Sequence, residues 1–214
     1  MLFTFDFYFA KMHITLTNTG KRYNREWIFR HIDHEFIIGK KYAITGPNGS
    51  GKSTLLQVIA GSVTHNEGNI KWSMVNGELA NEEVYKHLSI AAPYLELVEE
   101  MTAKEFLEFH AQFKSLQLSI SEIIKIIGLE KAANKQIRYY SSGMKQRLKL
   151  AQSIFSNTSI LLLDEPTTNL DTAGIELYHQ LINLYTKDKL VIVSSNDKQE
   201  YDFCEEEIMI TNYK

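Results

Sequence analysis

The chain has 214 residues, of which 44% are hydrophobic and 23% charged, and its net charge is −3. This balance is typical of one globular domain that buries a core, and it lacks the overall basic charge that favours nucleic acid or an anionic membrane surface. The single cysteine excludes an internal disulfide and a cysteine-rich metal site, and it favours a reducing compartment. No apolar run in the sequence approaches the roughly 20 residues that span a bilayer.

The first eleven residues, MLFTFDFYFAK, are apolar but lack the positive flank and cleavage site of a signal peptide. Two interpretations remain open, an additional edge strand or a start codon assigned too early, with Met12 as the true start. The second is favoured. We therefore expect one domain over residues 12–214, with 1–11 as an extension or a miscalled start.

The next part of the chain predicts strands interrupted by one helix. Alternating or continuously apolar stretches typical of strands are, in order, HITLTNTGKRYN, WIFRHIDHEF, KYAIT, GNIKWS and LSIAAP. The first two predict an antiparallel start. KYAIT, residues 41–45, stops at GPNGSG, and a helix KSTLLQVIAG follows and is closed by Gly61.

Between about Met101 and Gly128 the pattern becomes helical. The stretches TAKEFLEFHAQF and SISEIIKIIGL each place Thr or Ser before a glutamate, as helix N-caps do. Later elements are a helix after SSG, the strand SILLLDEP, the helix GIELYHQLINLYT, and the strands LVIVSS and EEIMIT. SILLLDEP is apolar almost throughout, as in a parallel strand buried on both faces. The order predicts an α/β core with a helical insertion.

A phosphate-binding loop is predicted at GPNGSGKST, which fits the pattern G-x-x-x-x-G-K-[ST] between a strand and a helix. Glycines let the backbone turn its N–H groups toward a polyphosphate, Lys52 brings a positive charge to the β and γ oxygens, and Ser53 offers a hydroxyl to Mg²⁺. An unrelated glycine-rich turn is the alternative, which this context disfavours. The predicted nucleotide-binding residues are Gly46, Pro47, Asn48, Gly49, Ser50, Gly51, Lys52, Ser53 and Thr54.

Two adjacent acidic residues end the apolar strand ILLLDEP. Asp164 stands at the strand end, where a carboxylate reaches a Mg²⁺ shell. Glu165 follows and is expected to polarise a water for in-line attack on the γ-phosphate, so it is the predicted catalytic base beside Lys52. The alternative is that these acids cap the following helix.

A second anion site is predicted at YYSSGMKQRLKLAQ, residues 139–152. A helix start offers free backbone N–H groups and a positive dipole end, and basic residues follow in its first turns. The alternative is an ordinary helix N-cap with surface lysines.

The phosphate-binding loop, YSSGMKQR and LLLDEPTTNLD, in that order, resemble the nucleotide-binding subunits of ATP-binding cassette (ABC) transporters. The resemblance covers nearly the whole chain from about Met12. It implies a P-loop NTPase core with a mostly parallel sheet, an N-terminal antiparallel β-subdomain and an inserted helical subdomain. The expected core is 12–93 with 156–214, and the expected insertion, which carries the signature segment, is 94–155.

The signature segment of this family is usually Leu-Ser-Gly-Gly-Gln, and it binds the γ-phosphate of ATP held by the other protomer. Here it reads YSSGM and keeps Ser141 and Gly143, which the resemblance implies as nucleotide-binding residues in a head-to-tail dimer. Tyr23 matches the aromatic residue that stacks on adenine, although a tyrosine in a turn often only packs. Asp171 matches the loop that touches the opposite phosphate-binding loop, and it also suits a helix N-cap.

Two positions depart from the family pattern. Tyr94 replaces a glutamine that reaches Mg²⁺ and the attacking water, although a gap of one residue would place Pro93 there. Asn196 replaces a histidine that contacts the γ-phosphate. A phenol is a poorer Mg²⁺ ligand than an amide oxygen, and asparagine cannot become cationic. We therefore expect tight Mg-ATP binding with slow turnover.

The resemblance implies an ATPase with ATP and Mg²⁺ that drives a separate membrane permease, docked near 94–100. The implied location is the cytoplasm, on the inner face of the cell membrane, with no nucleic-acid partner and no membrane span in this chain. Two alternatives remain open. The departures favour a weakly active switch or a degenerate partner in a heterodimer. A soluble relative acting on ribosomes or in DNA repair would usually carry tandem cassettes or a long coiled-coil insertion.

Overall fold

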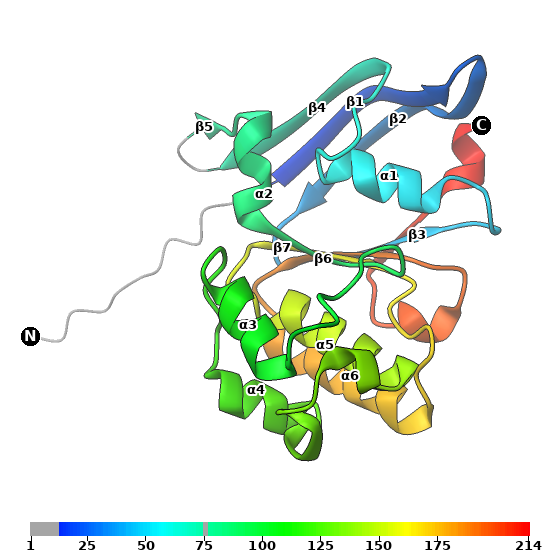
Figure 1. The fold of residues 1–214 in the computed structure, drawn as a ribbon. Coiled ribbons are helices and arrows are strands. Elements are labelled where there is room, and N and C mark those ends of the chain that lie inside the picture. The colour runs from blue at the N-terminus through cyan, green and yellow to red at the C-terminus, as the bar shows by residue number, and fades with distance from the viewer. Residues whose placement is uncertain (1–12, 75–76) are drawn as a thin grey trace, which may run out of the picture.

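The computed structural model describes residues 13–74 and 77–214. The expected status of residues 1–11 and of Met12 lies outside these described residues. Two sheets, with helices between them and beyond the second one, make up the described part (Figure 1). The predicted α/β class is therefore confirmed.

The first sheet is antiparallel and has the strand order β2-β1-β4-β5. Its strands are β1 (His13–Tyr23), β2 (Glu26–Ile37), β4 (Glu67–Met74) and β5 (Gly77–Glu78). The antiparallel start predicted from the sequence is confirmed, because β1 pairs with β2 from His13↔Ile37 to Tyr23↔Glu26. This register leaves Tyr23 at the tip of the hairpin.

The second sheet is parallel and has the strand order β6-β7-β8-β3-β9. Its strands are β3 (Lys41–Thr45), β6 (Leu88–Ala91), β7 (Ile160–Asp164), β8 (Leu190–Ser194) and β9 (Glu206–Met209). All residues of β7 and β8 are buried, as expected for strands covered on both faces. The carboxyl ends of these strands share one edge, so the segments after Thr45, Asp164 and Ser194 lie at that edge.

Helices cover the two faces of the parallel sheet. They are α1 (Lys52–Ile59), α2 (Val84–His87), α3 (Ala103–Ala111), α4 (Ile120–Ile126), α5 (Ser142–Phe155) and α6 (Thr172–Tyr185). The capping boxes predicted for α3 and α4 are present, with Thr102 and Ser119 as N-caps and glutamates at the third helical position. In sequence, α3, α4 and α5 stand between the neighbouring strands β6 and β7.

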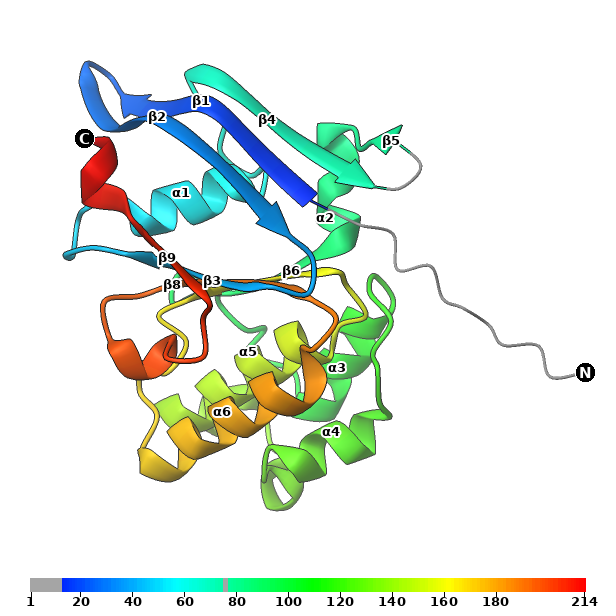
Figure 2. The same ribbon diagram turned by 180° about the vertical axis from the view of Figure 1, so that it is seen from behind.

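Two hydrophobic cores lie on opposite faces of the parallel sheet. Along β8, Val191 and Val193 belong to the core shared with α3–α6, whereas Leu190 and Ile192 belong to the core shared with α1 and the antiparallel sheet. Figure 1 and the reverse view in Figure 2 show α1 between the two sheets and α3–α6 beyond the parallel sheet. The start of α1 and the start of α5 therefore belong to different layers.

Candidate nucleotide-binding site

The predicted phosphate-binding loop joins β3 to α1. Its backbone takes left-handed angles that favour glycine, with φ of 75° at Gly49 and 105° at Gly51. A Cβ on Gly51 would lie 2.3 Å from Cγ2 of Ile28, so only glycine fits between the loop and β2. A hollow of about 250 Å³ opens here, and it is lined by Ile28, Asn48, Gly49, Ser50, Gly51, Lys52, Ser53, Thr54 and Glu165.

The Lys52 side chain is buried against this loop. Its Nζ donates to the carbonyl oxygens of Gly46 at 2.9 Å and Pro47 at 3.3 Å. The Ser50 Oγ is buried and has no hydrogen-bond partner within the described residues. A cation and an unpaired hydroxyl on a glycine-rich loop at the start of a helix fit an oxygen-rich anion such as a polyphosphate.

Asp164 is the last residue of β7 and Glu165 follows it, at the edge where β3 also ends. Asp164 is buried, and its Oδ1 accepts a hydrogen bond from the Ser194 hydroxyl at 2.6 Å. Glu165 has a φ of 44°, and its N–H donates to the Ser194 carbonyl at 2.9 Å. Its side chain lines the hollow of the phosphate-binding loop. The helix that follows is capped by Asp171, so the alternative of Asp164 and Glu165 as caps is wrong.

Both departures from the family pattern lie close to this site. Asn196 Nδ2 is 3.4 Å from Oδ1 of Asn48 in the phosphate-binding loop. Burial raises the pKa of the Tyr94 phenol, and the charge of Asp164 raises it further, while a hydrogen bond with the Gln57 side chain lowers it. Tyr94 therefore lies within the electrostatic reach of Asp164, and Gln57 on α1 is a neighbour that the sequence did not indicate.

The signature residues do not line the hollow of the phosphate-binding loop of the same chain. Ser141 caps α5, where its side chain accepts the Met144 N–H at 3.3 Å. Gly143 lies against the segment after Glu165, because a Cβ there would be 3.1 Å from the Asn169 carbonyl oxygen. Asp171 caps α6 by accepting the Gly174 N–H at 2.8 Å. Both Ser141 and Asp171 are thus helix N-caps, as the sequence allowed, while the nucleotide contacts expected of Ser141, Gly143 and Asp171 stay predictions.

Two buried side chains that sequence analysis missed hold the segment after Glu165. Gln146 on α5 donates from Nε2 to the Pro166 carbonyl at 2.6 Å. Glu200 accepts from the Thr167 N–H at 2.7 Å and from its hydroxyl at 2.5 Å. The only sign of these contacts in the sequence was a polar residue on the side of a helix that faces the core. These contacts link α5 and the segment after Asn196 to the turn that carries Glu165.

A strand, a glycine-rich loop around a buried lysine, and acids at the end of a parallel strand define a P-loop nucleotide-binding protein. The family model described as ABC transporter matches residues 29–168, which is more than half of the chain. The chain belongs to the ABC transporter family. The resemblance drawn from the three motifs is confirmed. Proteins of this family bind ATP, generally with Mg²⁺, and generally hydrolyse it.

Two proteins of similar sequence are named as ATP-binding proteins of transporters. The chain is 30% identical over 192 residues to the uncharacterized ABC transporter ATP-binding protein YybJ of Bacillus subtilis, with 87% of each chain covered. It is 28% identical to the lantibiotic transport ATP-binding protein SrtF of Streptococcus pyogenes, covering 86% of this chain and 79% of SrtF.

Solved structures share the same fold. The dimeric bacterial ABC transporter cassette MJ0796 superimposes with a TM-score of 0.78 at 26% identity, covering 92% of this chain and 94% of that one. The ATP-binding subunit of another ABC transporter gives a TM-score of 0.73 at 23% identity, covering 86% and 79%, and this likeness shows the fold alone. None of the helices in the described residues is long and apolar enough to cross a membrane.

Proposed function

We propose that the chain is an ATP-binding and ATP-hydrolysing subunit of an ABC transporter, which dimerises around Mg-ATP and drives a separate permease. The observation that carries this proposal is the hollow shared by the phosphate-binding loop and Glu165. The family membership and the ATP-binding relatives support the same activity. The proposed domain is 12–214, with a core of 12–93 and 156–214 and a helical insertion of 94–155.

Each proposed role follows from the chemistry of the side chain at its position. Lys52 and the loop N–H groups bind the phosphates, and Tyr23 stacks on adenine. Ser53, Asp164 and Tyr94 are the proposed side chains that would hold Mg²⁺, which when bound would neutralise charge on the phosphates.

Glu165 is the proposed general base, which accepts a proton from the attacking water. The Ser194 carbonyl fixes its backbone, while the contacts of Gln146 and Glu200 hold the following turn. Asn196 is proposed to donate one hydrogen bond to the γ-phosphate, and its contact with Asn48 of the phosphate-binding loop supports this role.

The proposed dimer joins the phosphate-binding loop of one chain to the signature segment of its partner. Support comes from the separation of these two half-sites within one chain and from the dimeric structure of the related cassette. Ser141 and Gly143 offer a helix start to an anion, and Asp171 is proposed to contact the opposite loop. Loss of the shared phosphate contact upon hydrolysis would weaken the dimer, which converts nucleotide state into opening.

The proposed permease contact is the surface near residues 94–100. The side chains of Leu95 and Val98 are apolar yet 38% and 39% exposed. A hollow of about 190 Å³ lies beside Leu95 between β6, α3 and α5, and Leu97, His110 and Lys149 are among its other lining residues. This role supports a location in the cytoplasm, on the inner face of the cell membrane.

A degenerate partner in a heterodimer is the second candidate, and the phenol of Tyr94 and the amide of Asn196 favour it. Mg²⁺-dependent ATP hydrolysis by the purified chain tests the two candidates, with excess EDTA as the blank. Hydrolysis that EDTA abolishes supports the proposed ATPase. Mg-ATP binding without any hydrolysis by the pure chain would contradict it and would favour the degenerate partner.

The Asn196→His variant is expected to hydrolyse Mg-ATP about tenfold faster than the parent, because a charge-assisted donor strengthens as charge develops on the γ-phosphate. The measurement is kcat at saturating Mg-ATP, and the dissociation constant is expected to change less than kcat. The Asn196→Gln variant is the control, since it keeps an amide. A histidine variant no faster than the parent would count against this account of slow turnover.

A further inference from the structure

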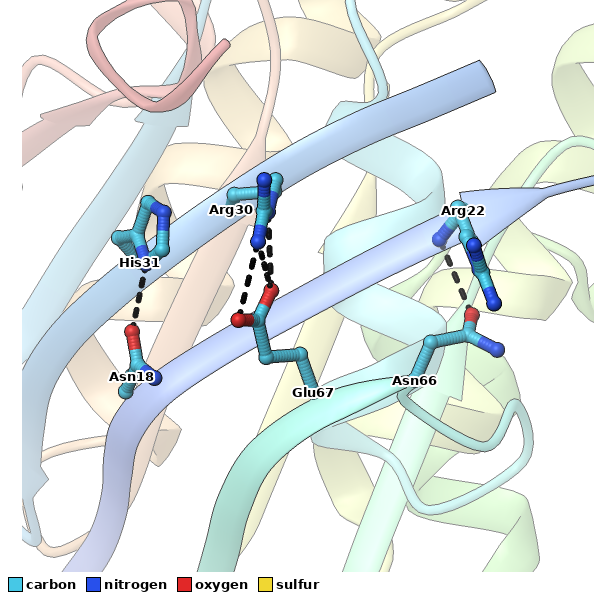
Figure 3. Close-up of polar contacts among 6 residues, drawn as sticks. All are labelled: Asn18, Arg22, Arg30, His31, Asn66 and Glu67. Atoms are coloured by element: carbon cyan, nitrogen blue, oxygen red, sulfur yellow. Dashed lines mark hydrogen bonds and ion pairs between the residues drawn. The ribbon is translucent and has the colours of Figure 1, made fainter. Parts of the chain in front are cut away.

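The end of β1 that carries Tyr23 is hydrogen-bonded to residues 64–67, which lead from α1 into β4. The Asn66 N–H donates to the Gly20 carbonyl at 2.8 Å, and the Arg22 N–H donates to Asn66 Oδ1 at 3.0 Å. Figure 3 shows the contact between Arg22 and Asn66 at this end of the strand. The tip of the hairpin is therefore tied to the segment that follows the helix of the phosphate-binding loop.

Lys21 makes a further contact with this segment, through its side chain. Its side chain is buried, and its Nζ donates to the Thr64 carbonyl at 2.7 Å. The same Nζ lies 4.8 Å from the centroid of the Tyr23 ring. No ion pair involves Lys21 within residues 13–74 and 77–214. The buried amine of Lys21 thus contacts a backbone carbonyl and an aromatic ring.

We propose that Lys21 is a positioning residue for the base of the nucleotide, acting through Tyr23. This inference rests on the proposed stacking of Tyr23 on adenine. The amine takes one face of the ring, while the side chain of Tyr23 is 48% exposed and has surface left for a base. A ring held in place by a cation loses less conformational freedom when a base stacks on it.

Through its hydrogen bond to Thr64, Lys21 is expected to hold the Tyr23 ring, and with it the base, at a fixed distance from the phosphate-binding loop. Thr64 lies a few residues after α1, and the first residue of α1 is Lys52 of the phosphate-binding loop. Lys21 therefore links the ring of Tyr23 to the segment directly after the helix that carries the phosphate contacts. A polyphosphate without a base does not contact Tyr23, so its binding is not expected to depend on Lys21.

Other contacts keep the antiparallel sheet together when Lys21 is changed. The Arg30 guanidinium donates to both carboxylate oxygens of Glu67 at 2.9 and 3.0 Å, and His31 lies 2.6 Å from Asn18 Oδ1 (Figure 3). Arg30 also stacks 4.2 Å from the Trp27 ring. Because none of these contacts uses Lys21, a Lys21 variant is expected to retain the sheet.

The experiment is titration calorimetry of the full chain with Mg-ATP and with Mg-tripolyphosphate. We expect Lys21→Met to raise the Kd for Mg-ATP about fivefold and to leave the Kd for Mg-tripolyphosphate unchanged. Lys21→Arg keeps a cation and is expected to bind Mg-ATP nearly as the parent does. Lys71→Met, which removes an exposed lysine of the same sheet, is the matched control and is expected to bind both ligands normally.

The Tyr23→Leu variant separates this inference from the proposed adenine contact. We expect Tyr23→Leu to weaken Mg-ATP binding alone, and Lys21→Met to add nothing in that background. An equal loss for both ligands in Lys21→Met would show a general structural effect and overturn the positioning role. Normal Mg-ATP binding by Lys21→Met beside a weakened Tyr23→Leu would overturn the inference and keep the adenine contact. Normal binding by Tyr23→Leu would overturn both.

Discussion

The Glu165→Gln variant is expected to lose ATP hydrolysis by about a hundredfold or more, because removal of a general base costs on the order of 10²–10⁴ in rate. Glutamine keeps the size of the side chain and the backbone hydrogen bond to the Ser194 carbonyl, so the turn after β7 is expected to persist. Binding of Mg-ATP is expected to remain within about threefold of the parent, since the phosphate contacts come from the loop. The measurement is kcat with Kd on the same preparations.

Glu176→Gln is the matched control for this variant, because Glu176 belongs to α6 and does not line the hollow of the phosphate-binding loop. It removes the same charge and is expected to leave kcat unchanged. A Glu165→Gln chain that still hydrolyses Mg-ATP at half the parent rate would remove Glu165 from the role of base.

The Gly51→Ala variant is expected to weaken Mg-ATP binding by about 10- to 100-fold, since a strained backbone position costs roughly 1–3 kcal/mol. Two independent reasons apply at this residue. Its φ of 105° is unfavourable for alanine, and the new Cβ would lie 2.3 Å from Cγ2 of Ile28. The Ile28 side chain, β2 or the loop must therefore shift, and a shift of the loop would move the N–H groups proposed to bind the phosphates. The dissociation constant for Mg-ATP is the measurement.

Gly39→Ala is the control for backbone strain. Gly39 has a φ of 81° in the turn between β2 and β3, and a Cβ there would meet no atom within 4 Å. This variant is expected to lower the unfolding temperature slightly and to bind Mg-ATP normally. If both alanine variants bound Mg-ATP as the parent does, the loop would tolerate a side chain at Gly51 and the proposed fit of the phosphates would be wrong.

The parts of this molecule that were predictable from sequence are those whose cause is local. The glycine-rich loop after KYAIT, and the capping boxes of Thr102 and Ser119, are contained within a few consecutive residues, and the structure has all of them. The alternation of Val191 and Ile192 between two cores follows from the period of a strand. Local rules were therefore sufficient for the order of the longer elements and for the phosphate-binding loop, but they missed the two-residue strand β5 and the four-residue helix α2.

The contacts missed from sequence join segments that are distant along the chain. Glu200 holds Thr167 from 33 residues away, and Lys21 reaches Thr64 from 43 residues away. The pairing of Tyr94 with Gln57 likewise depends on how β6 ends beside α1. No periodicity or motif marks such pairs, because they arise only when the folded chain brings these distant segments together. At the end of the chain, the strand predicted at EEIMIT is shorter than expected, because it ends at Met209 and a 3₁₀ turn follows.

Two copies of this chain are proposed to complete each other's nucleotide site. Sedimentation velocity of the Glu165→Gln chain in Mg-ATP and in Mg-ADP is the measurement, because hydrolysis is then not expected to remove the shared γ-phosphate. We expect a dimer in Mg-ATP, a monomer in Mg-ADP, and loss of the dimer when Gly143 at the start of α5 is changed to aspartate, which repels a phosphate. A chain that binds Mg-ATP yet remains a monomer at every protein concentration would exclude the shared site.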